Sequence, residues 1–286
     1  MYIPRRVLEE RLLQLLAEDV GQGDVTTAAI IASGTEARAD VVSKEDGVAA
    51  GTEETIILAE SLGLEAEAYV ADGDAIKKEQ VIICVSGDAR TILSAERTML
   101  NLLSRMSGIA TATRRMVERL RKAGLKTRIA ATRKTAPGLS YFDKKAVFIG
   151  GGDPHRLHLD DMILIKDNHI AIVGGAEWAV RRAKENASFS KKIEVEVARV
   201  EDAVLAAEAG ADVIMLDNLS PEQIKAAVKL LEKAGFLGKV LLEASGGILE
   251  ANILEYALTG VDVMSLGELT QSVKALDISL EITKNK

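Results

Sequence analysis

The residues best suited to chemistry lie close together in this sequence. All three histidines fall within residues 155–169, a stretch that also holds Arg156 and Lys166. Just before it, residues 97–134 contain eleven lysines and arginines but only one acidic residue, Glu118, although the whole chain has a formal charge of −7. Because a cationic concavity attracts and orients anions, we expect this part of the chain to bind a polyanionic ligand.

Composition narrows the class of protein. A chain of 286 residues predicts two unequal domains, and 48% hydrophobic residues suffice for packed cores. Net acidity argues against a general nucleic-acid binder, which needs a broad basic face. Cys84 is the only cysteine and cannot form an intramolecular disulfide, which fits a reducing compartment. With no apolar run approaching membrane-spanning length and a charged start, we expect a cytoplasmic protein without membrane association.

The order of apolar and polar runs predicts the fold. Residues 5–20 read as a helix, short strands and one helix follow, and Ser94 is predicted to cap a helix over 95–106. Beyond residue 112 the chain repeats strand, loop and helix, a pattern typical of parallel strands covered by helices. We expect strands at 128–131, 162–165, 193–197, 213–216, 240–242 and 261–265, and helices near 113–123, 176–186, 200–209, 221–234 and 250–257.

This pattern predicts an α/β fold, namely an open or irregular α/β barrel of about six to seven parallel strands with a smaller N-terminal α+β domain. The barrel domain is predicted to span 113–268. The N-terminal domain is predicted to span 1–112, with 269–286 returning to it.

Polar residues end each predicted strand, where barrels build their sites. They are Arg133, Lys134, Lys166, Glu196, Asp217, Ser245, Gly246, Gly247 and Gly267. Arginine forks such as Arg133 and Arg156 suit carboxylates and phosphates, and His155 is interpreted as a hydrogen-bond donor to an anion. Glu196 and Asp217 have the oxygen ligands that Mg²⁺ prefers, structural salt bridges being the alternative. Glycine N–H groups at the last strands can hold a monophosphate.

These residues lie in segments that resemble the quinolinate phosphoribosyltransferase family. The resemblance extends from about residue 20 to 280 and is carried by 94–111, TRKTAPGL at 132–139, GGG-x-x-HR at 150–156, LIKDNH at 164–169, EVEV at 194–197, LDN at 216–218 and EASGGI at 243–248. It implies an N-terminal α/β domain, a C-terminal open α/β barrel, and a homodimer, or a higher oligomer, with shared active sites. Ser140 and His158 depart from the family pattern, which expects a basic residue and glycine there.

The resemblance also implies a reaction and the residues that perform it. Quinolinate and phosphoribosyl pyrophosphate would give nicotinate mononucleotide, pyrophosphate and CO₂ in de novo NAD biosynthesis. Arg97 of the partner subunit, with Arg133, His155 and Arg156, would bind the quinolinate carboxylates. The catalytic residues would be Lys134 and Lys166, near the anionic groups, with Glu196 and Asp217, which would bind Mg²⁺ or the ribose hydroxyls.

Three other interpretations remain. A related barrel phosphoribosyltransferase could act on another pyridine carboxylate or serve molybdenum transport. Lys166 could form a Schiff base in an aldolase or pair with an anionic substrate, and the residues alone favour neither role. The turn at 72–80 resembles a lipoyl or biotin carrier, although the chain has no Met-Lys-Met attachment site.

Overall fold

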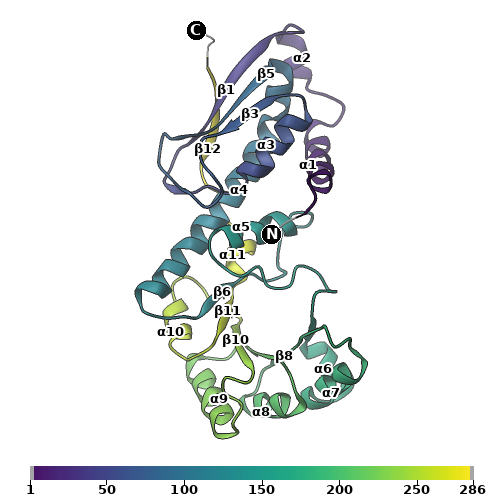
Figure 1. Cartoon of the computed structure of the whole chain (residues 1–286), viewed down its shortest axis with the longest axis vertical. Coiled ribbons are helices and arrows are strands. Elements are labelled where there is room, and N and C mark those ends of the chain that lie inside the picture. Colours follow the sequence, from purple (N-terminus) through teal and green to yellow (C-terminus); the bar gives the residue numbers. More distant parts are fainter. Residues whose placement is uncertain (1–2, 284–286) are drawn as a thin grey trace. The chain divides into compact units, whose positions relative to one another are not determined.

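The structure, a computed structural model, describes residues 3–283 and divides into two compact units (Figure 1). The first unit holds the chain through Arg114, the segment Tyr141–Gly151 and the residues from Val273 onward. The second unit holds Arg115–Ser140 and Gly152–Ser272. The boundaries lie two to four residues from the predicted ones, and Tyr141–Gly151 joins the first unit although it lies between two parts of the second, which was not predicted.

The first unit is built on an antiparallel sheet of strand order β12-β1-β5-β3. Its elements are α1 (Arg5–Val20), α2 (Val25–Ile30), β1 (Glu36–Ser43), β2 (Gly47–Val48), α3 (Thr52–Ser61), β3 (Glu65–Ala68), β4 (Ala75–Ile76), β5 (Val81–Asp88), most of α4 (Ala89–Lys122), α5 (Ser140–Ile149) and β12 (Ile278–Thr283). Strand β12 brings the C-terminal segment back to this unit by pairing with β1, Leu280 lying opposite Val41.

Helix α4 runs for 34 residues, so the prediction of two separate helices, over 95–106 and near 113–123, was wrong. It begins after Asp88, whose carboxylate accepts a hydrogen bond from the backbone N–H of Thr91 at 2.9 Å, and Ser94 lies inside it. Gly108 lies inside this helix. A Cβ at Gly108 would lie 2.2 Å from the carbonyl oxygen of Lys274, so glycine is needed there to let the backbone at Lys274 pack against the helix. Despite the length of α4, no helix within residues 3–283 is long and apolar enough to cross a membrane.

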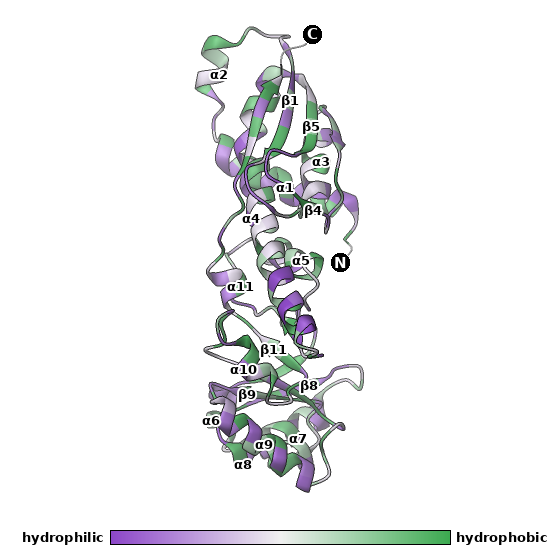
Figure 2. Ribbon diagram, turned by 90° about the vertical axis from the view of Figure 1, so that its left-hand side faces the viewer, coloured by the Kyte–Doolittle hydropathy of each residue, from purple (hydrophilic) through white to green (hydrophobic). Residues whose placement is uncertain are grey.

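The second unit confirms the predicted open α/β barrel. Its elements are β6 (Arg128–Ala130), β7 (Ile163–Ile165), α6 (Asp167–Val173), α7 (Ala176–Asn186), β8 (Ile193–Val197), α8 (Val200–Ala209), β9 (Val213–Asp217), α9 (Pro221–Lys233), β10 (Leu241–Ser245), α10 (Ile253–Ala257), β11 (Val263–Ser265) and α11 (Glu268–Gln271). The six strands are parallel, in the order β6-β11-β10-β9-β8-β7. Helices α7, α8 and α9 lie on one side of this sheet (Figure 1), and each carries both hydrophobic and hydrophilic residues (Figure 2).

A short segment extends this sheet beyond β6 and shows that the sheet is strongly curled. The N–H of Asp153 donates to the carbonyl of Ile129 at 2.8 Å, and the carbonyl of Asp153 accepts from Ala131 at 2.9 Å. His155, two residues on, reaches Glu194 on β8 at 3.4 Å. In a flat sheet these positions would be five strand spacings apart, roughly 24 Å. The curvature therefore brings the edge segment over the sheet interior.

Ion pairs explain why α5 belongs to the first unit. Arg105 of α4 binds the fully buried carboxylate of Asp143 with two hydrogen bonds, of 2.7 and 2.8 Å. The buried ammonium of Lys145 contacts Glu54 of α3 at 2.7 Å and also pairs with Glu53. Charges that are taken out of water must be paired, so these partners fix α5 in its place.

The Arg105 pair gives a stability prediction. Arg105→Ala leaves the Asp143 carboxylate buried without its guanidinium, and such a loss costs about 3–5 kcal/mol. Arg181→Ala is the matched control, because Arg181 makes a similar contact to Glu177 with half of its side chain exposed and should cost below about 1 kcal/mol. Urea unfolding followed by circular dichroism measures both, and equal losses would contradict the role given to the buried pair.

Candidate active site

The predicted site residues of the second unit line one cavity at the carboxyl ends of its strands. This cavity has a volume of about 730 Å³. Its lining includes Arg133, Lys134, His155, Arg156, Lys166, Glu196, Asp217, Ser245, Gly246, Gly247 and Gly267. Arg97 does not line it, because it is an exposed residue of α4 in the first unit. The structure thus brings together every predicted site residue of the barrel, while the roles given to them stay predictions.

A cavity of about 860 Å³ in the first unit is less suited to an anion. It is formed around α1, α3 and the segment after β3, and its charged lining is mainly acidic, including Glu53, Asp72 and Asp74. Its arginine, Arg5, already pairs with Glu60 at 2.5 Å. The cationic cavity of the second unit is therefore the candidate active site.

The period of the strands decides which side chains face this cavity. Residues two apart on a strand point to the same side of the sheet. On β8 this places Glu194 below Glu196, and on β10 it places Glu243 below Ser245. In the register of the sheet Ser245 pairs with Asp217 of β9. The strands thus present one polar row at their carboxyl ends and, two residues before it, a second row of carboxylates, of which Glu243 also lines the cavity.

Lys166 and Glu196 form an ion pair at the cavity mouth. The Nζ atom of Lys166 lies 2.5 Å from Oε1 of Glu196, with the lysine side chain about half exposed. The salt bridge left open as an alternative by the sequence is therefore present. An ammonium held by a carboxylate is not the desolvated, neutral amine that Schiff-base formation requires, which disfavours the aldolase interpretation.

Asp217 is positioned by a turn that depends on a glycine of the neighbouring loop. Asn218 has a left-handed φ of +55°, its N–H donates to the carbonyl of Ser245 at 2.8 Å, and its Nδ2 donates to Asp217 at 2.8 Å. Gly246 has a φ of +87°, and a Cβ there would lie 2.2 Å from Oδ1 of Asn218. The loops after β9 and β10 therefore fit together only with glycine at position 246.

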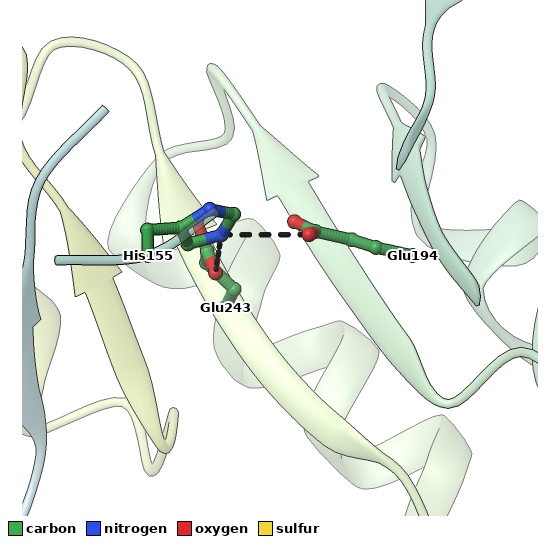
Figure 3. Close-up of side chains that lie close together, drawn as sticks. All are labelled: His155, Glu194 and Glu243. Atoms are coloured by element: carbon green, nitrogen blue, oxygen red, sulfur yellow. Dashed lines mark hydrogen bonds and ion pairs between the residues drawn. The ribbon is translucent and has the colours of Figure 1, made fainter. Parts of the chain in front are cut away.

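His155 lies between two buried carboxylates at the base of the cavity (Figure 3). Its Nε2 is 3.2 Å from Glu243 and 3.4 Å from Glu194, and these glutamate side chains are 2% and 0% exposed. Burial by itself lowers the pKa of His155, but the two nearby carboxylates outweigh this and raise the pKa to about 10. Burial raises the pKa of Glu194, and the neighbouring His155 opposes this rise, while Glu243 accepts the hydrogen bond from Nε2.

The sequence interpretation assigned no role to Glu194 and Glu243. Each lies two residues before a predicted site residue on the same strand, and this period of two was the available signal. It also missed Ser265, a buried hydroxyl in the cavity lining that has no hydrogen-bond partner among the described residues. His169 accepts a hydrogen bond from the N–H of Lys166 at 2.9 Å, which gives it a structural contact at the start of α6.

Comparison with known proteins identifies the family of this fold and site. The N-terminal domain of quinolinate phosphoribosyl transferase matches residues 24–107, and the C-terminal domain of that enzyme matches residues 109–281. The chain belongs to the quinolinate phosphoribosyl transferase family. Together the two matched domains include every predicted site residue, Arg97 in the first and the others in the second.

Individual members of the quinolinate phosphoribosyl transferase family agree over nearly the whole chain. A protein of Methanothermobacter thermautotrophicus, named probable nicotinate-nucleotide pyrophosphorylase [carboxylating], is 52% identical over 94% of this chain and 96% of its own length. The human nicotinate-nucleotide pyrophosphorylase [carboxylating] is 38% identical over 89% of this chain and 85% of its own. The solved structure of the nicotinate-nucleotide pyrophosphorylase from Francisella tularensis superposes with a TM-score of 0.87 at 36% identity, covering 99% and 98% of the two chains.

The packing of Gly246 against Asn218 can be tested with two alanine substitutions. Gly246 and Gly247 both have left-handed φ angles, but a Cβ at Gly247 meets nothing within 4 Å. Both variants carry backbone strain, whereas only Gly246→Ala adds a collision. Gly246→Ala should therefore lower the free energy of unfolding by about 1–3 kcal/mol more than Gly247→Ala, the usual cost of overpacking. Equal losses in chemical denaturation would show that the collision is relieved at no cost.

Proposed function

We propose that this chain converts quinolinate and phosphoribosyl pyrophosphate to nicotinate mononucleotide, pyrophosphate and CO₂, in de novo NAD biosynthesis. One observation carries the proposal: a single barrel-mouth cavity combines a set of cations with two carboxylates, Glu196 and Asp217. The cations are Arg133, Lys134, His155, Arg156 and Lys166. Quinolinate is a dianion, its co-substrate is a polyphosphate, and the reacting ribose becomes positively charged, so the reaction needs both kinds of group.

Arg133, His155 and Arg156 are proposed to bind the two carboxylates of quinolinate. Arg156 is 92% buried and His155 is nearly so, and charged hydrogen bonds are strongest where water is excluded. Guanidinium groups bind carboxylates bidentately, which fixes the plane of the pyridine ring as well as its position. A fixed ring presents its nitrogen to the ribose carbon, and such positioning supplies much of the rate enhancement of a two-substrate reaction.

Glu196 and Asp217 are proposed to act on the ribose side, by binding Mg²⁺ or the ribose hydroxyls. Their carboxylate oxygens suit Mg²⁺, which is usually held by one or two carboxylates together with substrate phosphates. When bound, Mg²⁺ would neutralise charge on the departing pyrophosphate. Lys166, already paired with Glu196, is available to the same anion, and the carboxylates stabilise the positive charge that develops on the ribose ring.

The proposed chemistry needs no covalent nucleophile from the protein. The nitrogen of quinolinate forms a bond to the ribose carbon while the bond from that carbon to pyrophosphate breaks. The ring nitrogen is now positively charged, so the adjacent carboxylate can depart as CO₂. The electron pair of the broken bond stays on the ring carbon beside this positive charge and then takes up a proton. The protein positions both substrates and supplies the electrostatic field.

Ser245, Gly246, Gly247 and Gly267 are proposed to bind the ribose 5′-phosphate. They lie at the carboxyl ends of β10 and β11, the last strands of the barrel in sequence, and their N–H groups can form a concave anion site.

We further propose a cytoplasmic homodimer in which Arg97 completes the site of the partner. Two-fold pairing creates two equivalent shared sites, which gives the exposed Arg97 of the first unit a function.

The reaction and its metal requirement are tested directly with the purified chain. Quinolinate and phosphoribosyl pyrophosphate should yield nicotinate mononucleotide and CO₂ in equal amounts when Mg²⁺ is present, and excess EDTA should abolish turnover. Chromatography of the nucleotide and trapping of labelled CO₂ measure the two products. Undiminished turnover in EDTA refutes the metal proposal alone, and no product at any Mg²⁺ concentration refutes the function.

The shared site is tested by mixing two inactive variants. Arg97→Ala and Arg156→Ala homodimers should both be nearly inactive, because each lacks a cation in every site. In a heterodimer one site collects both substitutions and the other has neither. Re-pairing should therefore restore up to about half of the wild-type activity per heterodimer. A heterodimer verified by native mass spectrometry that recovers no activity would exclude Arg97 from the partner's site.

A further inference from the structure

We propose that Glu194 and Glu243 are positioning residues, which hold His155 as an imidazolium by engaging its Nε2 from below and leave its Nδ1–H to donate to a carboxylate of quinolinate. Neither glutamate is among the residues predicted to touch substrate. The inference rests on the proposed function, because it takes quinolinate as the anion in the cavity.

The geometry gives each nitrogen of the ring a separate task. Nε2 lies 3.2 Å from Glu243 and 3.4 Å from Glu194, and both glutamate side chains are buried (Figure 3). Within the described residues Nδ1 of His155 has no hydrogen-bond partner, while the ring is 13% exposed and lines the cavity. The inner side of the ring is thus engaged by the protein, and the remaining donor is available to a ligand.

The charge state of the ring decides whether it attracts or repels a carboxylate. An imidazolium donates from both nitrogens, whereas a neutral ring that donates from Nε2 presents the lone pair of Nδ1. A lone pair facing a substrate carboxylate is repulsive. Two carboxylates at Nε2 favour the imidazolium, which converts Nδ1 from an acceptor to a donor.

The backbone around His155 is also held in place. His155 has a φ of +53°, a conformation that costs free energy in a residue other than glycine, and its N–H donates to Oδ1 of Asp153 at 2.8 Å. Strain of this kind persists only where surrounding contacts determine it. Here the contacts are the Asp153 turn at the backbone and the two glutamates at the ring.

Every charged group that faces the ring must be considered in a test with pH. From β8 it is faced by Glu194 and from β10 by Glu243, and both carboxylates favour the charged ring. On its own segment, Asp153 accepts from the backbone N–H of His155, and Arg156 acts on Glu194, whose pKa it lowers. The glutamates must therefore provide the attraction that keeps the ring charged.

The first experiment titrates the imidazole directly. The chain contains three histidines, so two-bond ¹H–¹⁵N spectra from pH 5.5 to 9.5 resolve each ring, and His155→Gln identifies the signals of His155. In the wild-type protein without substrate, the signals of His155 should remain those of an imidazolium up to at least about pH 9. Deprotonation near the ordinary value of about 6.5 overturns the proposal. Because this measurement needs no turnover, its outcome is independent of the proposed function.

The second experiment removes one charge and keeps the shape. In Glu243→Gln, the ring of His155 should deprotonate at lower pH, and at pH 8 the KM for quinolinate should rise by about 10- to 100-fold, the effect of losing one hydrogen bond to a charged group. The kcat and the KM for phosphoribosyl pyrophosphate should change much less. At pH 6 solvent protons recharge the ring, so most of the quinolinate affinity should return. A merely structural loss would not recover in acid.

Asp262→Asn is the matched control. Asp262 lies just before β11, and its carboxylate accepts a hydrogen bond from the backbone N–H of Leu242, the residue before Glu243, so this variant removes one negative charge beside β10 without altering a contact of His155. The titration of His155 and the KM for quinolinate should be unchanged in it. Equal effects in Asp262→Asn and Glu243→Gln overturn the proposal. So does a stoichiometric metal ion that elemental analysis finds in the wild-type protein and not in Glu243→Gln, because Nε2 would then be a metal ligand. If Glu243→Gln does not fold, the wild-type titration and Glu194→Gln decide.

Discussion

The contact of His155 with two buried glutamates is the constraint on which the barrel and its site depend. Glu194 and Glu243 lie in the sheet interior, where a carboxylate without a partner is costly. The partner is supplied by a segment that pairs beside β6, at the opposite edge of the sheet from β8, and the contact exists only because the sheet curls. Barrel curvature, the strained backbone of His155 and the neutralisation of the buried acids are therefore parts of one arrangement.

This arrangement also separates charges that would otherwise cancel. A site for quinolinate needs cations, whereas a site for a ribose that becomes positive needs carboxylates. The strand period places Glu194 two residues before Glu196 on β8 and Glu243 two residues before Ser245 on β10. Both buried glutamates contact Nε2 of His155, so a side chain that lines the cavity also partners the buried acids.

The features predicted correctly depend on local sequence patterns, whereas the features that were missed depend on contacts between residues far apart in the sequence. Helices α7 and α8 match their predicted spans because each amphipathic run is complete in itself. The continuity of α4 was missed because the apolar period was followed only to residue 106, and the packing of Gly108 against Lys274, far along the chain, gives no local signal. The cations of the cavity could be listed because parallel strands place their ends together. The partners of His155 could not, since a glutamate inside a strand gives no sign of which residue crosses the barrel to meet it.

Helix α5 shows how the first unit can influence the barrel site through the covalent chain. Arg133 and Lys134 precede this helix and His155 and Arg156 follow it, so both cationic segments continue directly into an element of the other unit. Asp143 and Lys145 fix α5 in the first unit by buried ion pairs. The ends of α5, to which these segments are joined, are therefore fixed within the first unit. In the sequence, a helix with three fully or nearly buried charged residues, Asp143, Lys144 and Lys145, thus separates the two cationic segments, and its burial restrains the chain where it joins each of them.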